Sequence, residues 1–401
     1  MSYPTISLFS GAMGLDLGLR EAGLDIRVSQ DIDPWCVKTA DANNHKSILG
    51  DIRKLLGDDP ECRFLLEPAG LQTGEVFAVV GGPPCQPFST AGNRLGTNDP
   101  RGSLFMEFIQ AIRAMHPRFF VMENVKGLLS VPLKHRPLKD RKDEPLVPEE
   151  TPGSAFEIIR QMFNDLGYKT VYGILDAAHY GVPQFRERLI IIGSRDNENI
   201  FLPKPTHFQI HQDPAHRWTT LKSAIEDLES SPGPCARFSV DRINLLRMIP
   251  MGGNWRNLPN DLIPIAMGGA FESAGGKVGF YRRLDYNQPS PTLVTSPVQK
   301  ATMLCHPTQD RPLSVREYAR IQQFPDDWRI EGNIADCYRQ IGNAVPIGLG
   351  KAIGQMLIAV ATNSAEIRTR RLRGTSVHQS LHQAQQISVE RVAGGKSGAA
   401  K

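Results

Sequence analysis

One cysteine of this chain lies in a segment whose composition would present it to a substrate. The segment reads Gly81-Gly82-Pro83-Pro84-Cys85-Gln86-Pro87-Phe88-Ser89. Its glycines and prolines can neither continue a helix nor pair as a central strand, yet they let the backbone approach a flat molecule closely. A thiolate is a strong nucleophile, so Cys85 is a candidate for covalent catalysis. A structural turn around a small buried thiol is the alternative, because free cysteines are among the most buried residues.

A glutamate later in the chain is placed to work with this cysteine. The apolar runs 76–80 and 118–122 are typical of buried strands, and they lead toward Cys85 and Glu123. Open α/β sheets bind ligands at the carboxyl ends of their strands, so both side chains should face one crevice. A buried carboxyl has a raised pKa and can act as an acid near neutral pH. From the residues alone, a capping or ion-paired role for Glu123 stays open.

Two arginines stand in a short extended segment, Gln184-Phe185-Arg186-Glu187-Arg188, just before the apolar run 189–192. Alternate residues of an extended segment face the same side, so Arg186 and Arg188 should project together. Such a pair usually forms a salt bridge or a solvated face. Contact with a bound substrate is the second interpretation.

The elements around these residues predict an α/β fold. A strand at 6–9, a glycine turn through Gly14 and a helix at 15–22 form the first unit of a nucleotide-binding sheet. A second strand at 27–30 ends at Asp31, about 20 residues after the turn, where such folds hydrogen-bond ribose hydroxyls. Asp51 follows Gly50 and is placed to accept from an adenine amino group, while no Gly-x-x-x-x-Gly-Lys phosphate loop occurs.

Composition bounds the class of protein. With 401 residues, 40% of them hydrophobic, the chain can bury one large core and a smaller satellite. No run of about 18 apolar residues occurs, and the N-terminus leads directly into a strand-like segment, so we expect a cytosolic protein without a membrane span or secretory signal. The six cysteines form no Cys-x-x-Cys pair, which argues against a disulfide framework or a zinc site; Cys305-His306 would need distant partner ligands to bind a metal.

The net charge of +4 is concentrated in the last forty residues. Between Ala361 and Lys401 there are seven Lys and Arg against two acidic residues, which leaves the remainder of the chain at −1. We expect a disordered basic tail over 363–401, and nonspecific attraction to phosphates is a secondary possibility for it. Strands and helices alternate over 1–195 and again over 311–362, whereas 196–310 gains prolines, glycines and aromatics and is predicted to form a second domain.

Taken in order, these motifs resemble those of the bacterial cytosine-5 DNA methyltransferases, and the resemblance covers nearly all of residues 5–360. It implies a Rossmann-like methyltransferase sheet with a smaller target-recognition domain at 196–310. It also implies that Cys85 is the nucleophile and that Glu123 donates a proton to the ring nitrogen of cytosine. Arg186 and Arg188 are expected to contact the carbonyl oxygen of the base and the neighbouring phosphate, with Arg188 the better candidate for the base.

The same resemblance implies S-adenosyl-L-methionine as the cofactor. Phe9 and Ile32 would flank it, Asp31 would bind its ribose and Asp51 would face its adenine. The full set of implied cofactor-binding residues is Phe9, Gly11, Gly14, Asp31, Ile32, Asp51, Ile52, Pro83, Leu104, Asn343 and Ala344. One residue departs from the family pattern, because Met13 stands where a second glycine is usual. Its side chain must point away from the cofactor, or the loop must shift.

Double-stranded DNA is the implied substrate, with the target cytosine flipped out of the helix. The expected DNA contacts are Gln86, Ser89, Arg256, Arg282 and Arg283. The glycine-spaced segment 91–103 is expected to close over the substrate, and the compact recognition region suggests a short target sequence. The chemistry requires no metal. A bacterial or phage enzyme acting as a cytoplasmic monomer is the simplest setting. The sequence leaves open whether a restriction endonuclease is paired with it.

Three other functions compete with this interpretation. A branch of the family methylates tRNA, but it typically carries a Cys-Phe-Thr string that this chain lacks. An inactive DNA-binding relative should have lost Cys85 or Glu123, and both are present. A nicotinamide-dependent dehydrogenase would need a Gly-x-Gly-x-x-Gly turn, which is absent, and would leave the Pro-Pro-Cys segment unexplained.

Overall fold

The computed structural model describes residues 2–84, 104–134, 136, 145–272 and 277–364. Met1–Met356 form one compact unit and Leu357–Lys401 a second. The predicted nucleophile Cys85, the expected DNA contacts Gln86 and Ser89, the segment 91–103 and nearly all of the basic tail lie outside the described residues.

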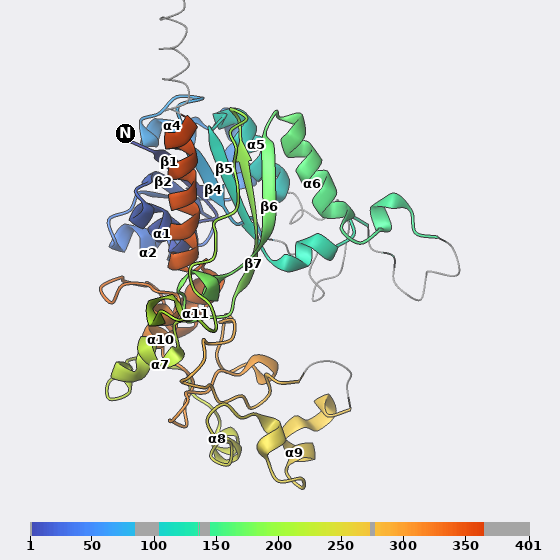
Figure 1. Cartoon of the computed structure of the whole chain (residues 1–401), viewed down its shortest axis with the longest axis vertical. Helices are drawn as coiled ribbons and strands as arrows, with labels where there is room; N and C mark the ends of the chain where they lie inside the picture. Colours follow the sequence, from blue (N-terminus) through green and yellow to red (C-terminus); the bar gives the residue numbers. More distant parts are fainter. Residues whose placement is uncertain (1, 85–103, 135, 137–144, 273–276, 365–401) are drawn as a thin grey trace, which may run out of the picture. The chain divides into compact units, whose positions relative to one another are not determined.

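A seven-stranded sheet forms the centre of the first unit (Figure 1). Its strands are β1 (Pro4–Leu8), β2 (Asp25–Asp31), β3 (Ser47–Leu49), β4 (Ala78–Gly81), β5 (Phe119–Asn124), β6 (Lys169–Asp176) and β7 (Glu187–Ser194). They lie in the order β3-β2-β1-β4-β5-β7-β6. Strands β1 to β5 pair in parallel, whereas β7 runs antiparallel to both β5 and β6. The predicted Rossmann-like α/β fold is confirmed.

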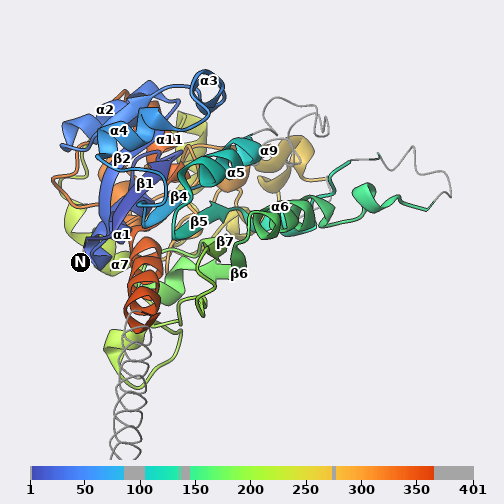
Figure 2. The same ribbon diagram turned by 90° about the horizontal axis from the view of Figure 1, so that it is seen from above.

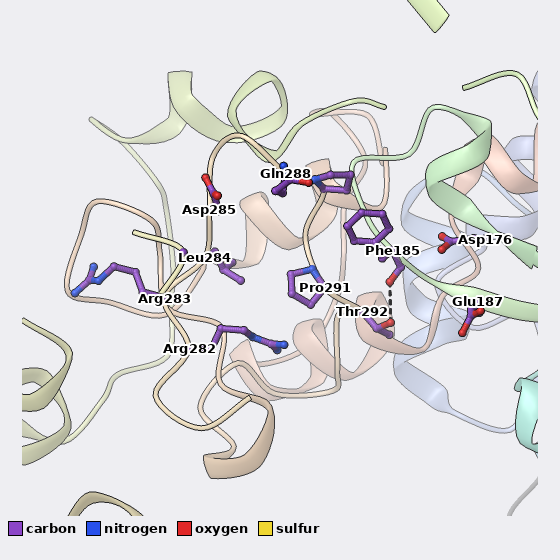
Figure 3. A pocket seen from close by; sticks show the side chains of 12 residues that line it. Asp176, Phe185, Glu187, Arg282, Arg283, Leu284, Asp285, Gln288, Pro291 and Thr292 are labelled. Carbon is purple, nitrogen blue, oxygen red and sulfur yellow. Dashed lines mark hydrogen bonds between the residues drawn. The ribbon is translucent and has the colours of Figure 1, made fainter. Parts of the chain in front are cut away.

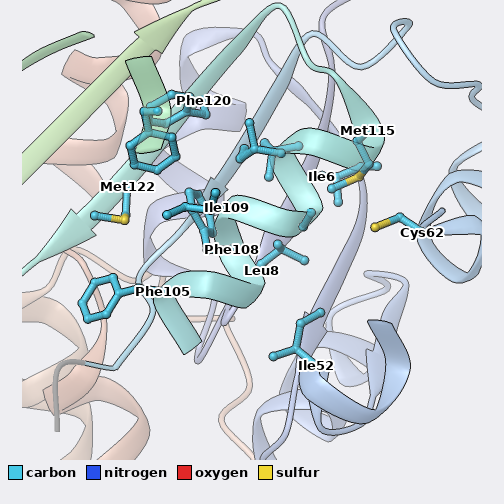
Figure 4. Packing of buried hydrophobic residues seen from close by; sticks show 14 of the residues in the cluster. Ile6, Leu8, Ile52, Cys62, Phe105, Phe108, Ile109, Met115, Phe120 and Met122 are labelled. Atoms are coloured by element: carbon cyan, nitrogen blue, oxygen red, sulfur yellow. The ribbon is translucent and has the colours of Figure 1, made fainter. Parts of the chain in front are cut away.

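Helices cover both faces of this sheet, because most of its strands are apolar on both sides. The helices that connect the strands are α1 (Gly14–Ala22), α2 (Pro34–Ala42), α3 (Ile52–Asp58), α4 (Arg63–Ala69), α5 (Leu104–Met115) and α6 (Ser154–Asp165). Figure 2 shows α5 and α6 on one side of the strands and α1 on the other. The α5 side contains the larger core, in which Ile6 and Leu8 of β1 and Phe120 and Met122 of β5 pack against α5 (Figure 4).

Residues 196–310 contain few regular elements, as predicted. The later α-helices are α7 (Leu221–Ile225), α8 (Val240–Leu246), α9 (Ile263–Met267), α10 (Val315–Ile321), α11 (Ile334–Asn343) and a helix over 347–364. Short 3-10 helices occur at Lys126–Ser130, Pro148–Glu150, Ala177–Tyr180, Pro214–His216, Glu226–Leu228, Trp255–Asn257, Gly268–Ala270 and Lys300–Thr302. Around α8 and α9 a separate hydrophobic cluster forms, which includes Phe238, Leu246, Tyr281 and Met303. The division of the first unit into a catalytic and a recognition domain stays a prediction.

One helical stretch of the described residues, Ile334–Ser364, is long and apolar enough to cross a membrane by length and composition. About two thirds of its apolar window, 67%, is buried inside the protein. A buried core helix passes the same test, so this stretch is weak evidence for a span.

Met13, the residue that departs from the family pattern, takes the backbone conformation of a glycine. Its φ is 67° and its ψ 25°, in the left-handed region, at the N-terminal cap of α1. The side chain is fully buried and packs in the cluster that joins α1 and α2 to α10 and α11. The turn therefore keeps the shape that a glycine would give it, while the methionine side chain points into the core.

We expect Met13→Gly to destabilise the protein although it removes backbone strain. The left-handed conformation costs a non-glycine residue about 1–2 kcal/mol, whereas truncating a buried methionine costs about 2–5 kcal/mol. The free energy of unfolding, measured by urea denaturation, should fall by about 1–3 kcal/mol. Asn44→Gly is the matched control, because Asn44 has a φ of 60° but an exposed side chain; it should be neutral or stabilising. A stabilised Met13→Gly variant would contradict this account.

Candidate active site

Two of the predicted catalytic residues, Glu123 and Arg188, meet at one edge of the sheet because of the direction of β7. Strands β4 and β5 end at this edge, and the antiparallel β7 begins there. Glu123 pairs in register with Ile190, and Asn124 with Leu189. The first residues of β7 therefore lie beside the last residues of β5, and Arg188 reaches Glu123.

Glu123 and Arg188 form an ion pair at this edge. Arg188 Nε lies 2.7 Å from Glu123 Oε1, and each side chain is 13% exposed. Arg188 Nη1 also donates to the carbonyl oxygen of Glu187 at 2.8 Å. A charge-assisted hydrogen bond between two nearly buried groups fixes the carboxylate in place. The structure thus brings together two of the predicted catalytic residues.

The backbone that leads into Cys85 packs directly on this pair. A Cβ atom at Gly82 would lie 2.7 Å from Glu123 Oε2, so a glycine is required for the carboxylate to stay where it is. Asn124, which is 4% exposed, donates from Nδ2 to the carbonyl oxygen of Pro83 at 2.8 Å. Sequence reasoning assigned no role to Asn124; a short amide at the end of a buried strand was the available signal. These contacts fix the loop two residues before the predicted nucleophile.

Arg186 does not project beside Arg188, so that expectation is wrong. Its side chain is 1% exposed, and its guanidinium donates to Leu293 O at 3.0 Å and to Gly342 O at 2.9 Å. Burial, with a smaller effect from Arg188, lowers the pKa of the Arg186 guanidinium. The physical reason is that β7 begins only at Glu187, so its alternation does not extend back to Arg186. In this position Arg186 holds backbone rather than a base or a phosphate.

The first glycine turn fits a nucleotide-like cofactor. Gly11 N donates to Asp31 Oδ2 at 2.8 Å, and Asp31 Oδ1 accepts from Asp33 N at 2.8 Å. Burial raises the pKa of the Asp31 carboxyl. A Cβ at Gly11 would meet no atom within 4 Å, so open space lies in front of the turn. Beside it, the apolar Ile32 side chain is 59% exposed, as a surface that stacks on a flat ring would be.

The same turn packs against the C-terminal end of α11. A Cβ at Gly14 would lie 2.2 Å from Val345 O and 3.2 Å from Ala344 Cβ. Asn343 is exposed next to the buried Ala344. Two segments more than 300 residues apart in the sequence, both predicted to bind cofactor, are therefore neighbours. Phe9, with a φ of 53°, is half-buried at the end of β1 and packs against the larger core.

In the second acidic motif, Asp51-Ile52, the position of Ile52 differs from the expectation. Asp51 caps α3 by accepting from Arg53 N at 3.0 Å, and its carboxylate also accepts from Arg53 Nε at 3.0 Å. The Arg53 hydrogen bond is the largest influence that lowers the pKa of Asp51. Ile52 is 2% exposed and lies in the larger core (Figure 4), so its side chain does not line a cofactor site. Leu104 begins α5 and packs partly against that core.

Asp16 is a buried acid beneath the turn that sequence reasoning did not select. It lies in the first turn of α1 and is 1% exposed. Neither side-chain oxygen has a hydrogen-bond partner among the described residues. Burial raises the pKa of this carboxyl to about 7. A protonated Asp16 would avoid placing a second negative charge near Asp31.

A cleft of about 500 Å³ opens between the start of β7 and the segment 282–292 (Figure 3). Its lining residues include Asp176, Phe185, Glu187, Arg282, Gln288 and Thr292. The Arg282 guanidinium points into the cleft, whereas the neighbouring Arg283 points away from it (Figure 3). Arg282 is anchored by a hydrogen bond from Nε to Met303 O at 3.1 Å.

Arg283 is a structural residue, which corrects its expected role as a DNA contact. It is 5% exposed and donates to four carbonyl oxygens and one carboxylate, those of Ile249, His306, Gln309, Leu246 and Asp310. All the donors of a guanidinium can be satisfied this way, so none is left for a nucleic acid. Arg256, by contrast, is exposed, and its guanidinium lies 4.8 Å from the centre of the Trp255 ring.

Over the described ranges, no group of three or more His, Cys, Asp or Glu residues is arranged to hold a metal ion. The described cysteines, Cys36, Cys62, Cys235, Cys305 and Cys337, are all free thiols.

Comparison with known proteins identifies close relatives. Residues 3–359 match the family model described as C-5 cytosine-specific DNA methylase. The type II methyltransferase M.PspPI of Psychrobacter sp. (strain TA137) is 38% identical over 369 residues, 89% of this chain and 79% of the relative. M.Eco47II of Escherichia coli is 37% identical with the same coverage. In fold, the chain resembles a putative DNA modification methyltransferase encoded within an E. coli prophage, with a TM-score of 0.58 at 24% identity over 90% of this chain and 100% of that one.

The close approach of Gly82 to Glu123 predicts that one methyl group added at residue 82 lowers activity. Gly82→Ala should push the Glu123 carboxylate out of its pair with Arg188 and lower kcat by about 10²-fold or more, the usual contribution of a positioned acid. Methyl incorporation into DNA under saturating substrate is the measurement. Gly57→Ala in α3, where an added Cβ meets nothing within 4 Å, should keep full activity. Full activity of a folded Gly82→Ala variant would show that this geometry is not required.

Proposed function

The chain belongs to the C-5 cytosine-specific DNA methylases and is an S-adenosylmethionine-dependent DNA (cytosine-5) methyltransferase; from this premise we propose that Cys85 is its nucleophile. The Cys85 thiolate adds to carbon 6 of the target cytosine, which converts the ring to an enamine with a reactive carbon 5. After methylation a base removes the proton from carbon 5, and elimination releases the thiolate. The Glu123–Arg188 pair beside the entry to the Cys85 loop is the observation that carries this assignment.

Glu123 and Arg188 divide the remaining work at the base. The Glu123 carboxyl protonates the ring nitrogen as the thiolate adds, so that negative charge does not build up on the ring. Arg188 stabilises charge on the neighbouring carbonyl oxygen and keeps the carboxyl oriented. Its contact at 2.7 Å supports this division, because one arginine touches the acid directly while most of its donors remain for a base. Gly82 and Asn124 position the backbone between them.

The cofactor supplies an electrophilic methyl group when it is bound. Asp31 would hold the ribose through the carboxylate that orders the Gly11 turn. Phe9 and Ile32 would flank the cofactor, and Asp51, which caps α3, would face its adenine. Asn343 and Ala344 would close the pocket, and Ala344 approaches Gly14 closely. Pro83 and Leu104 would complete its wall.

Target recognition belongs to residues 196–310. Arg282, which points into the cleft, reads a base edge or holds a phosphate, and the exposed Arg256 holds the DNA backbone. Gln86 and Ser89 contact the DNA near the flipped cytosine. Flipping costs a few kcal/mol, which contacts from the recognition region and closure of the segment 91–103 offset.

The biological setting is a restriction-modification system. The relatives at 37–38% identity are named type II methyltransferases, which supports a role in protecting DNA against a matching endonuclease. Such an enzyme works in the cytoplasm, at the nucleoid, and acts as a monomer with no stable complex with the endonuclease.

Labelling with methyl-tritiated S-adenosylmethionine tests the assignment of Cys85. Wild-type protein should label unmethylated genomic DNA and not bulk tRNA, and Cys85→Ser should lose transfer while still binding cofactor. Cys235→Ser, which alters a half-buried free thiol, is the matched control and should keep full activity. Bisulfite sequencing of the product should show protected cytosines in one short context. Turnover by Cys85→Ser would refute the mechanism, and label on tRNA alone would move the substrate to RNA.

The two adjacent arginines should separate DNA contact from stability. Arg282→Gln should weaken binding to the methylated context by about 1–3 kcal/mol, as loss of one specific contact does, while the melting temperature stays within a few degrees. Arg283→Gln should lower the melting temperature instead, because it leaves several buried carbonyl oxygens without a donor. Equal effects of the two substitutions on DNA binding at unchanged stability would contradict the separation.

A further inference from the structure

Three buried side chains outside the catalytic pair form one hydrogen-bonded network. Gln184 and Gln322 are fully buried, and Arg186 is 1% exposed. Gln184 Nε2 donates to Gln322 Oε1 at 3.0 Å. Gln184 and Arg186 belong to the segment before β7, and Gln322 is the residue that ends α10. Among the described residues, none of these three side chains is hydrogen-bonded to Pro83 or Pro84, which precede Cys85. Their buried polar groups therefore need an explanation other than positioning that segment.

One end of this network clamps the segment that borders the DNA cleft. Leu293 N donates to Gln184 Oε1 at 2.9 Å, and Leu293 O accepts from Arg186 Nη1 at 3.0 Å. The preceding residue, Thr292, lines the cleft and donates from Oγ1 to Phe185 O at 2.8 Å. Both backbone groups of Leu293 are thus held by side chains, and Thr292 cannot shift without breaking these bonds.

The other end holds the last turn of α11. Arg186 Nη2 donates to Gly342 O at 2.9 Å, and Gln322 Nε2 donates to Ile341 O at 2.8 Å and to Ala344 O at 3.2 Å. The last carbonyl oxygens of a helix have no N–H partner in a following turn, and here the capping Ala344 N reaches only Ile341 O, at 3.2 Å. The two side chains supply the other donors at this helix end. The bonded carbonyl oxygens flank Asn343 and Ala344, which are proposed to close the cofactor pocket.

The two clamped segments also touch each other. A Cβ at Gly342 would lie 2.5 Å from Val294 O and 3.0 Å from Thr295 Cα. The end of α11 therefore packs directly on the chain that follows Leu293. A displacement of either segment must move the other or disrupt the network.

Burying the polar groups of this network costs free energy of folding. Arg186 Nε is buried and has no hydrogen-bond partner among the described residues. Replacing buried ionic groups by apolar ones of similar volume is often neutral or stabilising. The other polar side-chain atoms of the three residues are paired, and buried hydrogen bonds of this kind specify a single arrangement of the segments that they join. Fixing the relative position of two segments is a function that apolar packing would perform less specifically.

We propose that Gln184, Arg186 and Gln322 are positioning residues that couple DNA binding to cofactor binding. The inference rests on the proposed assignment of the cleft at Thr292 to DNA and of Asn343 and Ala344 to the cofactor. A ligand that displaces or holds one clamped segment displaces or holds the other through the network, so binding of the first ligand changes the free energy of binding the second. The coupling is reciprocal: each ligand raises the affinity for the other by the same factor.

The test measures this coupling factor directly. The dissociation constant of S-adenosylhomocysteine, which permits no turnover, is determined by calorimetry with and without a short duplex carrying the context found by bisulfite sequencing. The ratio of the two constants is the coupling factor, which for linked sites is typically about 5- to 150-fold. Arg186→Lys and Gln322→Met should each reduce it at least about threefold. The affinity for S-adenosylhomocysteine alone should change less than the coupling does.

Gln340→Met is the matched control. Gln340 is also a buried glutamine, 1% exposed, but it bonds to Glu331 O at 2.7 Å and to Thr39 Oγ1 at 2.7 Å, outside the network. It should keep the wild-type coupling factor. A role limited to stability would lower the melting temperature of all three variants and leave their coupling factors equal.

Two results would overturn the proposal: a wild-type coupling factor of one, or an unchanged factor in the folded network variants. Should Arg186→Lys fail to fold, Gln322→Met decides alone, because it removes the donor to Ile341 O and Ala344 O and leaves the Arg186 guanidinium in place. Failure of the proposed function is distinguishable, since it would appear earlier as absence of a methylated DNA context in wild-type protein.

Discussion

The direction of one strand determines the chemistry available to this protein. If β7 ran parallel to β5, its first residues would lie at the opposite ends of the strands. The length of a strand, at roughly 3.3 Å per residue, would then separate them from Glu123. Because β7 is antiparallel, it begins where β5 ends, and Arg188, its second residue, meets Glu123 at 2.7 Å. The loop after β4 ends at the same edge, and Gly82 leaves the space that the carboxylate occupies. Strand order and direction thus bring Gly82, Glu123 and Arg188 together.

The arginines of this site show that residue type does not decide between binding a ligand and holding the fold. Arg186 and Arg283 are nearly fully buried and donate mainly to backbone carbonyl oxygens. Arg188, two residues after Arg186, pairs with Glu123, and Arg282, next to Arg283, lines the cleft. A planar guanidinium with five donors can join several irregular segments at once, which suits a region with few regular elements. Each of these two less buried arginines therefore has a structural arginine close to it in the chain.

Local sequence patterns predicted the sheet, the glycine turn and the strand ends that carry Asp31 and Glu123, because these depend on apolar runs and turn residues close in sequence. The reversal of β7 was not predicted, since an apolar run carries no information on strand direction. The role of Arg186 was mispredicted for a related reason: alternation holds only within a strand, and the contacts of Arg186 are to residues more than 100 positions away. Ile52 follows a polar motif yet belongs to the core, which only the packing of α3 reveals. The burial of Met13 resolves the departure from the family pattern that the sequence left open.

Long-range backbone contacts also explain how the site can form beside residues 196–310, which contain few regular elements. The segment after the cleft, the end of α11 and the glycine turn of α1 form a continuous series of close backbone approaches, through Val294, Gly342, Val345 and Gly14. At two of these points, Gly14 and Gly342, only a glycine fits. The distance between the segments is therefore set by main-chain contact and not by the size of a side chain. Side-chain donors from Gln322 and Arg186 then bind carbonyl oxygens in the last turn of α11, where the helix itself supplies few donors. The irregular region 196–310 therefore joins the sheet through fixed main-chain contacts near Leu293, although the segments that meet there lie far apart in the sequence.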